Sequence, residues 1–224
     1  MKNLILPLFV LLLFGCEKTE EQLPGNPYNY VGEAHNEQLH QLRTEHRAAL
    51  DGIDAPLEVE AYIFQAAFEE GIGMQALRGT KERLGLTQEQ TLAQANYANA
   101  STLCDVFDFP QPLADIICPT IGRLLAIEGG TQAAQKEIEQ VIREAEVKLM
   151  SAQEDQEGYP AAMAFLATAR HSSQYWLQHR ANGKPKWWQV VLADAAGAGI
   201  GFLGGGGTAV PLAVGMSTVV AELE

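Results

Sequence analysis

The sequence has few basic residues and few cysteines. Lys and Arg total 15 of 224 residues against 28 Asp and Glu, which gives a formal net charge of −13. A nucleic-acid binder generally needs a cationic surface, so this balance excludes a general role of that kind. Three cysteines are too few for a small disulfide scaffold, and no repeat at solenoid spacing is present. A hydrophobic content of 47% nevertheless predicts a folded chain.

The common catalytic motifs are also missing. The sequence contains no HExxH zinc motif, no GxSxG nucleophile elbow and no phosphate-binding P-loop. Glu37 and His40 have the Glu-x-x-His spacing of di-iron bundles, but such a site needs a second copy that this chain lacks. His35, His40 and His46 lie near acidic residues, a pattern that favours a solvated helix face over a weak zinc site. The sequence therefore predicts no catalytic residue, no metal and no cofactor, and a protein that is not an enzyme.

Sustained strand alternation is absent, which predicts an all-α fold. We expect a bundle of about six helices that ends in a glycine-rich helical hairpin. Before the hairpin, helical periodicity or a start signal places helices over residues 33–50, 57–70, 131–151 and 161–180, and one beginning at Thr87. Thr87 is followed by Gln90, which is the spacing of a capping box.

Charge is nearly absent from the first fifteen residues. Lys2 precedes an apolar run over residues 4–14, which has the length of a signal peptide. Leu13-Phe14-Gly15-Cys16 follows and resembles a bacterial lipobox. The resemblance implies cleavage before Cys16, acylation of its sulfur and membrane lipid as the partner of the acyl anchor. The alternative is an ordinary secretory signal with a chance cysteine.

The residues after the cysteine predict the destination. Glu17-Lys18-Thr19-Glu20-Glu21 resembles the Cys-x-Lys-acidic export signal of surface lipoproteins in Bacteroidota, with Thr19 inserted. No Asp follows Cys16, whereas Asp is the usual retention signal for the inner membrane. We therefore expect an outer-membrane, lipid-anchored protein, and leave open whether it faces the periplasm or the exterior. A plain solvated tether would have a similar composition.

A second resemblance involves the stretch NPYNYVGEAHNEQL. It is similar to the opening of uncharacterised outer-membrane lipoproteins of Bacteroidota, in which Asn-Pro-Tyr-x-Tyr-Val-Gly precedes a His-Asn pair and a Gly/Ala-rich tail follows later. The matching residues are Asn26, Pro27, Tyr28, Tyr30, Val31, Gly32, His35 and Asn36. The resemblance implies a family and no activity.

Acidic residues are nearly absent from the last third of the chain. Residues 158–224 contain three acidic residues (Asp194, Glu222 and Glu224) and four basic ones. We therefore predict a signal peptide over 1–15, an acidic tether over 16–32, an acidic helical domain over 33–157, and a C-terminal part over 158–224. The C-terminal part comprises a basic, aromatic helix and an apolar hairpin, which we expect to pack on the same domain.

Residues 195–221 carry no charge at all. Trp187 and Trp188 precede this run, as aromatic residues often do at a membrane interface. Gly197, Gly201 and Gly205 form a tandem GxxxG (glycine-zipper) pattern, which allows close approach of a second helix. The glycines at 204–207 split the run into helices over 187–203 and 208–221, each too short to span a bilayer comfortably.

Three roles for this hairpin remain open: packing on its own domain, lying in or on a membrane, or forming a pore after oligomerisation. Asp194 is the one charge beside the run. We expect it to pair with Lys184 or Lys186, or to cap a helix that begins near Ala195.

Cys104 and Cys118 remain after Cys16 is assigned to acylation. An envelope location is oxidising, so we predict a disulfide between them, with two buried free thiols as the alternative. The combined prediction is a non-enzymatic cell-envelope lipoprotein of structural or interaction type, whose protein partner the sequence does not identify. The alternative is a membrane-active effector, pore-forming or bacteriocin-like, that acts through the hairpin. An enzyme with a site assembled from scattered residues is the third hypothesis.

Overall fold

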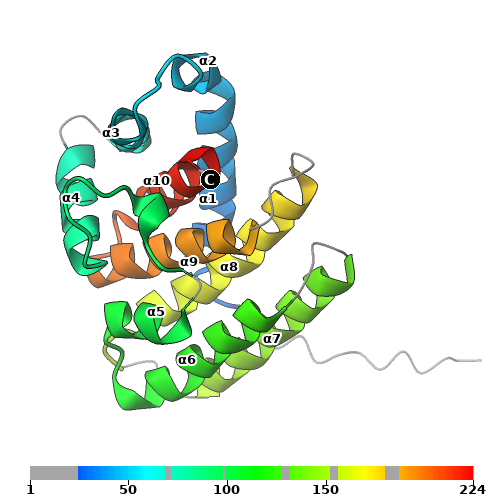
Figure 1. The fold of residues 1–224 in the computed structure, drawn as a ribbon. Coiled ribbons are helices and arrows are strands. Elements are labelled where there is room, and N and C mark those ends of the chain that lie inside the picture. The colour runs from blue at the N-terminus through cyan, green and yellow to red at the C-terminus, as the bar shows by residue number, and fades with distance from the viewer. Residues whose placement is uncertain are drawn as a thin grey trace, which may run out of the picture.

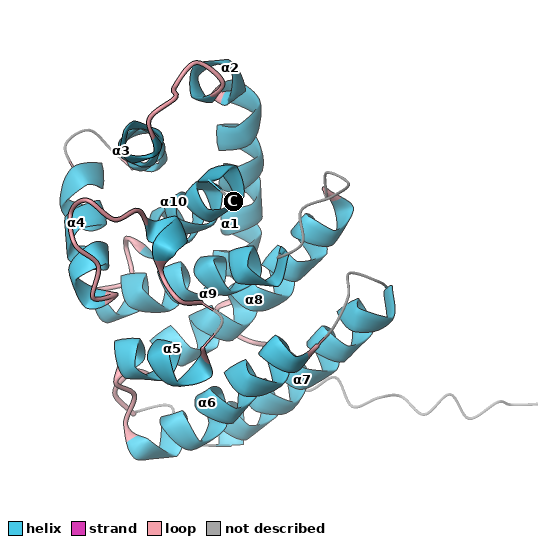
Figure 2. Ribbon diagram, viewed as in Figure 1, coloured by secondary structure: helices cyan, strands magenta, loops and turns pink. Residues whose placement is uncertain are grey.

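The chain folds almost entirely into helices (Figures 1 and 2). The structure is a computed structural model that describes residues 25–68, 72–97, 99–127, 132–151, 156–179 and 187–223. Within these ranges it contains ten α-helices, one short 3-10 helix and no strand, so the predicted all-α class is confirmed. The helices are α1 (Asn29–Glu45), α2 (Arg47–Leu50), α3 (Pro56–Ala67), α4 (Gly73–Arg83), η1 (Leu92–Gln94), α5 (Ala100–Phe107), α6 (Gln111–Ala126), α7 (Gln132–Ser151), α8 (Tyr159–Gln178), α9 (Trp187–Leu203) and α10 (Ala209–Leu223).

The number of helices differs from the expected six or so because the predicted helix over 33–50 divides into α1 and α2, and α4, α5 and α6 form where no helix was placed. Pro112 occupies the first turn of α6, a position where its missing N–H costs no hydrogen bond. Asn99 caps α5 by accepting hydrogen bonds from the backbone N–H groups of Ser101 and Thr102, at 2.9 and 3.3 Å. Local caps of this kind stabilise helices too short to show a clear periodicity.

The helix expected to begin at Thr87 does not form. The side chain of Gln90 accepts a hydrogen bond from the Thr87 N–H at 2.9 Å, as a capping box requires, but only a turn follows. The same Thr-x-x-Gln pattern recurs at Thr91 and Gln94, where a reciprocal capping box starts the three-residue η1. The capping box at Thr91 begins only four residues after the one at Thr87, so the chain starts η1 there and no helix extends from Thr87.

The centre of the molecule consists of α8 and α9. Every residue of α9 from Val190 to Gly201 is buried, because this helix packs against α8 on one side and α10 on another. The helices α1 and α7 pack against α8, α3 packs against α10, and α6 packs against α7. The helices α8, α9 and α10 therefore occupy the middle of one hydrophobic core that reaches from Leu39 to Ala221, with the acidic helices around them (Figure 1).

The predicted tether and the folded body overlap. The tether was expected to extend to residue 32, but α1 begins at Asn29, and Asn26, Val31 and Gly32 are buried. Pro24, Gly25 and Pro27 favour an irregular segment. The folded body nevertheless begins before residue 32, since the first turn of α1 is held by tertiary contacts described below.

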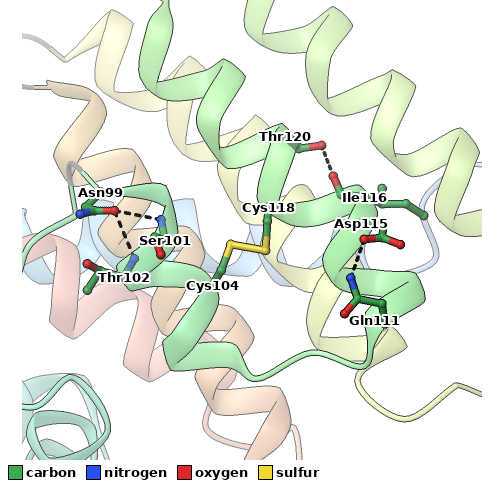
Figure 3. The surroundings of a disulfide bond; sticks show 9 residues. All are labelled: Asn99, Ser101, Thr102, Cys104, Gln111, Asp115, Ile116, Cys118 and Thr120. Carbon is green, nitrogen blue, oxygen red and sulfur yellow. Dashed lines mark hydrogen bonds between the residues drawn. A yellow bond between two sulfur atoms is a disulfide. The ribbon is translucent and has the colours of Figure 1, made fainter.

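Cys104 of α5 and Cys118 of α6 are joined by a disulfide, with their Cα atoms 5.8 Å apart (Figure 3). The bond closes a loop between residues 14 positions apart. A loop of about this length stabilises a fold by roughly 3 kcal/mol in the chain-entropy model. Next to the bridge, Phe107 at the end of α5 lies where a side chain at Gly199 would stand, so α5, which the disulfide links to α6, packs against α9.

The helices α9 and α10 run antiparallel at very short distance. A Cβ atom built on Gly197 would lie 2.6 Å from the Cα of Ala213, and one on Gly201 would lie 2.4 Å from the Cα of Ala209. Gly205, the third member of the GxxxG series, makes no such contact: it lies in the connecting turn with a φ of +112°. None of the helices in the described ranges is long and apolar enough to cross a membrane.

Candidate functional site

Asp194 is a fully buried carboxylate in the middle of α9. Its Oδ1 lies 2.7 Å from the Nε2 of His35 on α1. Its Oδ2 accepts hydrogen bonds from the Nε1–H of Trp176, at 2.9 Å, and from the hydroxyl of Ser172, both on α8. His35, Ser172 and Asp194 have no exposed surface, and Trp176 is 6% exposed. We call these four residues the Asp194 cluster.

Both ring nitrogens of His35 face hydrogen-bond partners. Asn36 donates a hydrogen bond from its side-chain amide to the backbone oxygen of His171 at 2.8 Å, which leaves its Oδ1 to face the Nδ1 of His35 at 3.0 Å. This arrangement suits a donor N–H at Nδ1, and Nε2 lies 2.7 Å from the Asp194 carboxylate. Burial of a charged group is costly unless it is paired and hydrogen-bonded, and this cluster meets both conditions.

The Asp194 cluster contains the residue types of a hydrolase triad without its arrangement. In such a triad the serine is hydrogen-bonded to the histidine and is open to substrate. Here Ser172 donates to Asp194 instead, and neither side chain reaches solvent. The carboxylate is the common acceptor, so the arrangement joins α1, α8 and α9 rather than activating a nucleophile.

A second buried ion pair joins α3 to α4. The ammonium of Lys81 lies 2.5 Å from Oε2 of Glu60, and both residues are at most 3% exposed. The other Glu60 oxygen accepts a hydrogen bond from the backbone N–H of Leu92 at 2.6 Å. Lys81 also donates to the backbone oxygen of Gln88 at 3.3 Å, so this pair fixes the segment before η1.

A third buried acid ties the start of the fold to α7 and α8. Glu146 of α7 accepts a hydrogen bond from the Asn26 amide at 2.7 Å and pairs with Arg170 of α8. Asn26 also donates to the backbone oxygen of Met163 at 2.9 Å, and Arg170 donates to the side chain of Asn29 at 3.3 Å. These bonds explain why α1 begins earlier than the sequence suggested.

The residues that carry the Bacteroidota resemblance now have structural roles. Asn26 binds Glu146, Tyr28 packs against Phe202, and Asn36 binds the backbone of α8. Gly32 lies where a Cβ atom would approach His171 to 2.6 Å and the Ala167 oxygen to 2.7 Å. The stretch therefore docks α1 onto α8 and α9.

Two expectations about polar residues prove wrong. His35 is not on a solvated face, because α1 packs against α8 and α10 and His35 itself reaches Asp194 of α9. Asp194 does not cap a helix near Ala195, since α9 begins at Trp187, about two turns earlier. Its observed partners are His35, Ser172 and Trp176, whereas Lys184 and Lys186 lie outside the described residues.

The remaining predicted site residues, those of the lipid anchor and of the glycine-rich hairpin, do not form one site. Cys16 and the side chain of Trp187 lie outside the described residues, and Trp188 packs against the core as a half-buried residue. Gly197 and Gly201 meet α10, whereas Gly205 does not. Among the residues that the structure describes, no group of three His, Cys, Asp or Glu side chains could hold a metal ion.

Sequence reasoning missed Ser172, Trp176, Glu60 and Lys81. Asp194 stands out in the sequence because it is a charge at the edge of a long uncharged run, whereas no such pattern marks its partners.

An open depression of about 500 Å³ lies at the C-terminal end of α10, where Leu57 and Glu89 line it together with Leu223. A backbone hydrogen bond and the Thr87 side chain lower the pKa of Glu89 there.

His171 lies against Gly32 beside the Asp194 cluster, and its titration has a consequence for stability. Burial lowers the pKa of His171, and the positive charge of Arg170 lowers it further. An unfolded histidine titrates near pH 6.5, so between that pH and the lower folded pKa the unfolded chain binds more protons. We expect stability to fall as the pH decreases through this window.

The His171→Gln variant should remove that part of the slope while leaving stability at pH 8 little changed. Urea unfolding of both proteins at a series of pH values between about 5 and 8 measures the effect. An identical slope in the variant would show that His171 does not contribute to the acid sensitivity.

The buried polar groups around Asp194, Glu60 and Glu146 therefore hold helices together. No family model, curated protein or solved structure matches this chain.

Proposed function

We propose that this protein is a non-enzymatic lipoprotein of the outer membrane, anchored by acylated Cys16, whose helical domain has a structural or interaction role in the envelope. The observation that carries the proposal is the Leu13–Cys16 sequence placed just ahead of a folded body that begins near Asn26. Acyl chains bury methylene groups at roughly 0.8 kcal/mol each, so two or three chains suffice for a stable anchor.

The buried polar clusters support the non-enzymatic part of the proposal. Each of the three buried acids makes at least two hydrogen bonds or ion pairs with other helices or segments; these acids are Asp194, Glu60 and Glu146. Groups engaged in this way hold the helices together, and moving them toward a substrate would break those contacts. The disulfide between Cys104 and Cys118 suits an oxidising compartment such as the envelope.

The decisive experiment is expression of the full chain in a Gram-negative host. We expect the N-terminal peptide to carry the mass of a lipid-modified cysteine and the protein to fractionate with the outer membrane. The Cys16→Ala variant should lose both properties. As a matched control, the Cys104→Ser/Cys118→Ser double variant should keep the lipid mass. A wild-type protein without that mass, or a Cys16→Ala variant that stays in the membrane, would overturn the proposal.

The uncharged run of residues 195–221 favours one second candidate, a membrane-active effector that inserts α9 and α10. Insertion would have to separate α9 from α8 and bring Asp194 toward the bilayer, where an acidic side chain is costly. Dye-filled liposomes distinguish the two roles: an anchored envelope protein leaves the vesicles intact, whereas an inserting effector releases the dye.

A further inference from the structure

The start of the fold meets the α9–α10 turn in a group of aromatic and apolar residues. The Tyr28 ring lies 5.2 Å from the Phe202 ring, edge to face, and 6.3 Å from the Tyr30 ring. Val210 packs with Tyr28 and Phe202 against the same small cluster of buried residues, which contains Val31 and four alanines. Tyr30 is 57% exposed, the largest value for a large hydrophobic side chain in the described part of the chain. We call Tyr28, Tyr30, Phe202 and Val210 the aromatic end.

The aromatic end differs from the rest of this acidic molecule in its charge. Residues 195–221, which supply Phe202, Val210 and the glycine turn between them, contain no charged side chain in a protein of net charge −13. The exposed Glu33 lies one turn further along α1 than Tyr30. Arg170, whose side chain is 22% exposed, donates a hydrogen bond to Asn29, which lies between Tyr28 and Tyr30 in the chain. Tyrosine rings bordered by charged groups are typical of the headgroup region of a bilayer.

The length of chain before the fold limits how far this end can lie from the membrane. Only residues 17–24 separate Cys16 from Gly25, the first residue that the structure describes. Nine residue steps of fully extended backbone span roughly 30 Å. Tyr28 and Tyr30 of the aromatic end follow Cys16 by only 12 and 14 positions, so they are among the first side chains of the fold beyond an acylated cysteine. The C-terminal end of α10, with Leu223 and the neighbouring Leu57, is about 20 Å further along that helix from Val210.

We propose that the aromatic end rests on the lipid headgroups of the membrane that holds Cys16, with α2 and α3 directed away from it. This inference depends on the proposed lipid anchor. The acyl chains supply the affinity, and the aromatic end sets the orientation. In Figure 1, α2 and α3 lie at the end of α1 that is far from its first turn.

The test uses the acylated full-length protein in vesicles of zwitterionic phospholipid. A nitroxide-bearing amino acid replaces Tyr30 in one variant and Leu57 in the other, so that native cysteines stay intact. Both positions are in first helical turns and are exposed, at 57% and 40%. Oxygen concentrates in the membrane and a water-soluble nickel chelate is excluded from it, so the ratio of the two accessibilities reports depth.

We expect the oxygen-to-nickel ratio to be several-fold higher for the label at position 30 than for the label at position 57. Equal, water-like ratios at both positions in a protein that carries its lipid would overturn the orientation and leave the lipoprotein intact. Immersion of position 57 alone would overturn it as well. Absence of the lipid mass on Cys16, measured on the same samples, would remove the anchor on which both proposals rest.

Discussion

Replacing Asp194 with alanine is expected to destabilise the fold by about 3–5 kcal/mol, the usual cost of removing one partner of a buried ion pair. The change leaves His35, Ser172 and Trp176 without their common acceptor in a region with almost no exposure to water. Stability would be measured by chemical denaturation followed by circular dichroism. A loss below about 1 kcal/mol would contradict a central role for this carboxylate.

The Asp194→Asn variant separates charge from hydrogen bonding. An asparagine oxygen can accept from Ser172 and Trp176, while its amide can donate to a His35 ring that keeps its proton on Nδ1. All hydrogen bonds of the cluster are then satisfied without any charge. We therefore expect Asp194→Asn to cost much less than Asp194→Ala. Equal losses would mean that the ion pair itself, rather than the hydrogen-bond network, stabilises the cluster.

The contrast between α9 and the Asp194 cluster shows what a single sequence can predict here. The end of α9 at Leu203 was predicted because the glycines at 204–207 split the long uncharged run, which is a local property. The partners of Asp194 lie 18, 22 and 159 positions away in the chain, and no local pattern connects them. Which face of α1 is buried depends on where α8 packs, so His35 could not be distinguished from His40 by its neighbours.

The beginning of α1 was missed for a related reason. Pro24, Gly25 and Pro27 indicate an irregular segment, and that indication is local. The bonds that order Asn26 come from Glu146 and from the backbone of Met163, 120 and 137 positions away. Tertiary contacts therefore extend the folded region beyond the limit that local preferences set.

The glycines of the C-terminal third also show that a local sequence pattern predicts only part of the structure. The GxxxG spacing predicted close helix approach and placed Gly197, Gly201 and Gly205 on equal terms. In the structure only the first two meet α10, since the helix ends at Leu203 and Gly205 adopts a positive φ in the turn. A four-residue spacing does not indicate where a helix stops, so the role of each glycine has to be tested separately.

Gly201→Val is expected to destabilise the fold by about 3 kcal/mol, the upper end of the usual range, because overpacking against backbone atoms cannot be relieved by a change of rotamer. Even the first side-chain atom at this position would lie 2.4 Å from the Cα and 2.5 Å from the N of Ala209. α10 would have to move away from α9, which would open the centre of the core. Chemical denaturation of the variant and the wild type measures the loss.

Two further glycine variants serve as controls for that result. Gly122 lies inside α6, and a Cβ atom added there would meet no atom within 4 Å, so Gly122→Ala should stabilise the protein by roughly 0.5–1 kcal/mol through its higher helix propensity. Gly205→Ala has open space as well but a φ of +112°, so we expect a loss through backbone strain of about 1–3 kcal/mol. If Gly201→Val behaved like Gly122→Ala, the close approach of α9 and α10 would be wrong, because a crowded glycine and an uncrowded one cannot respond alike.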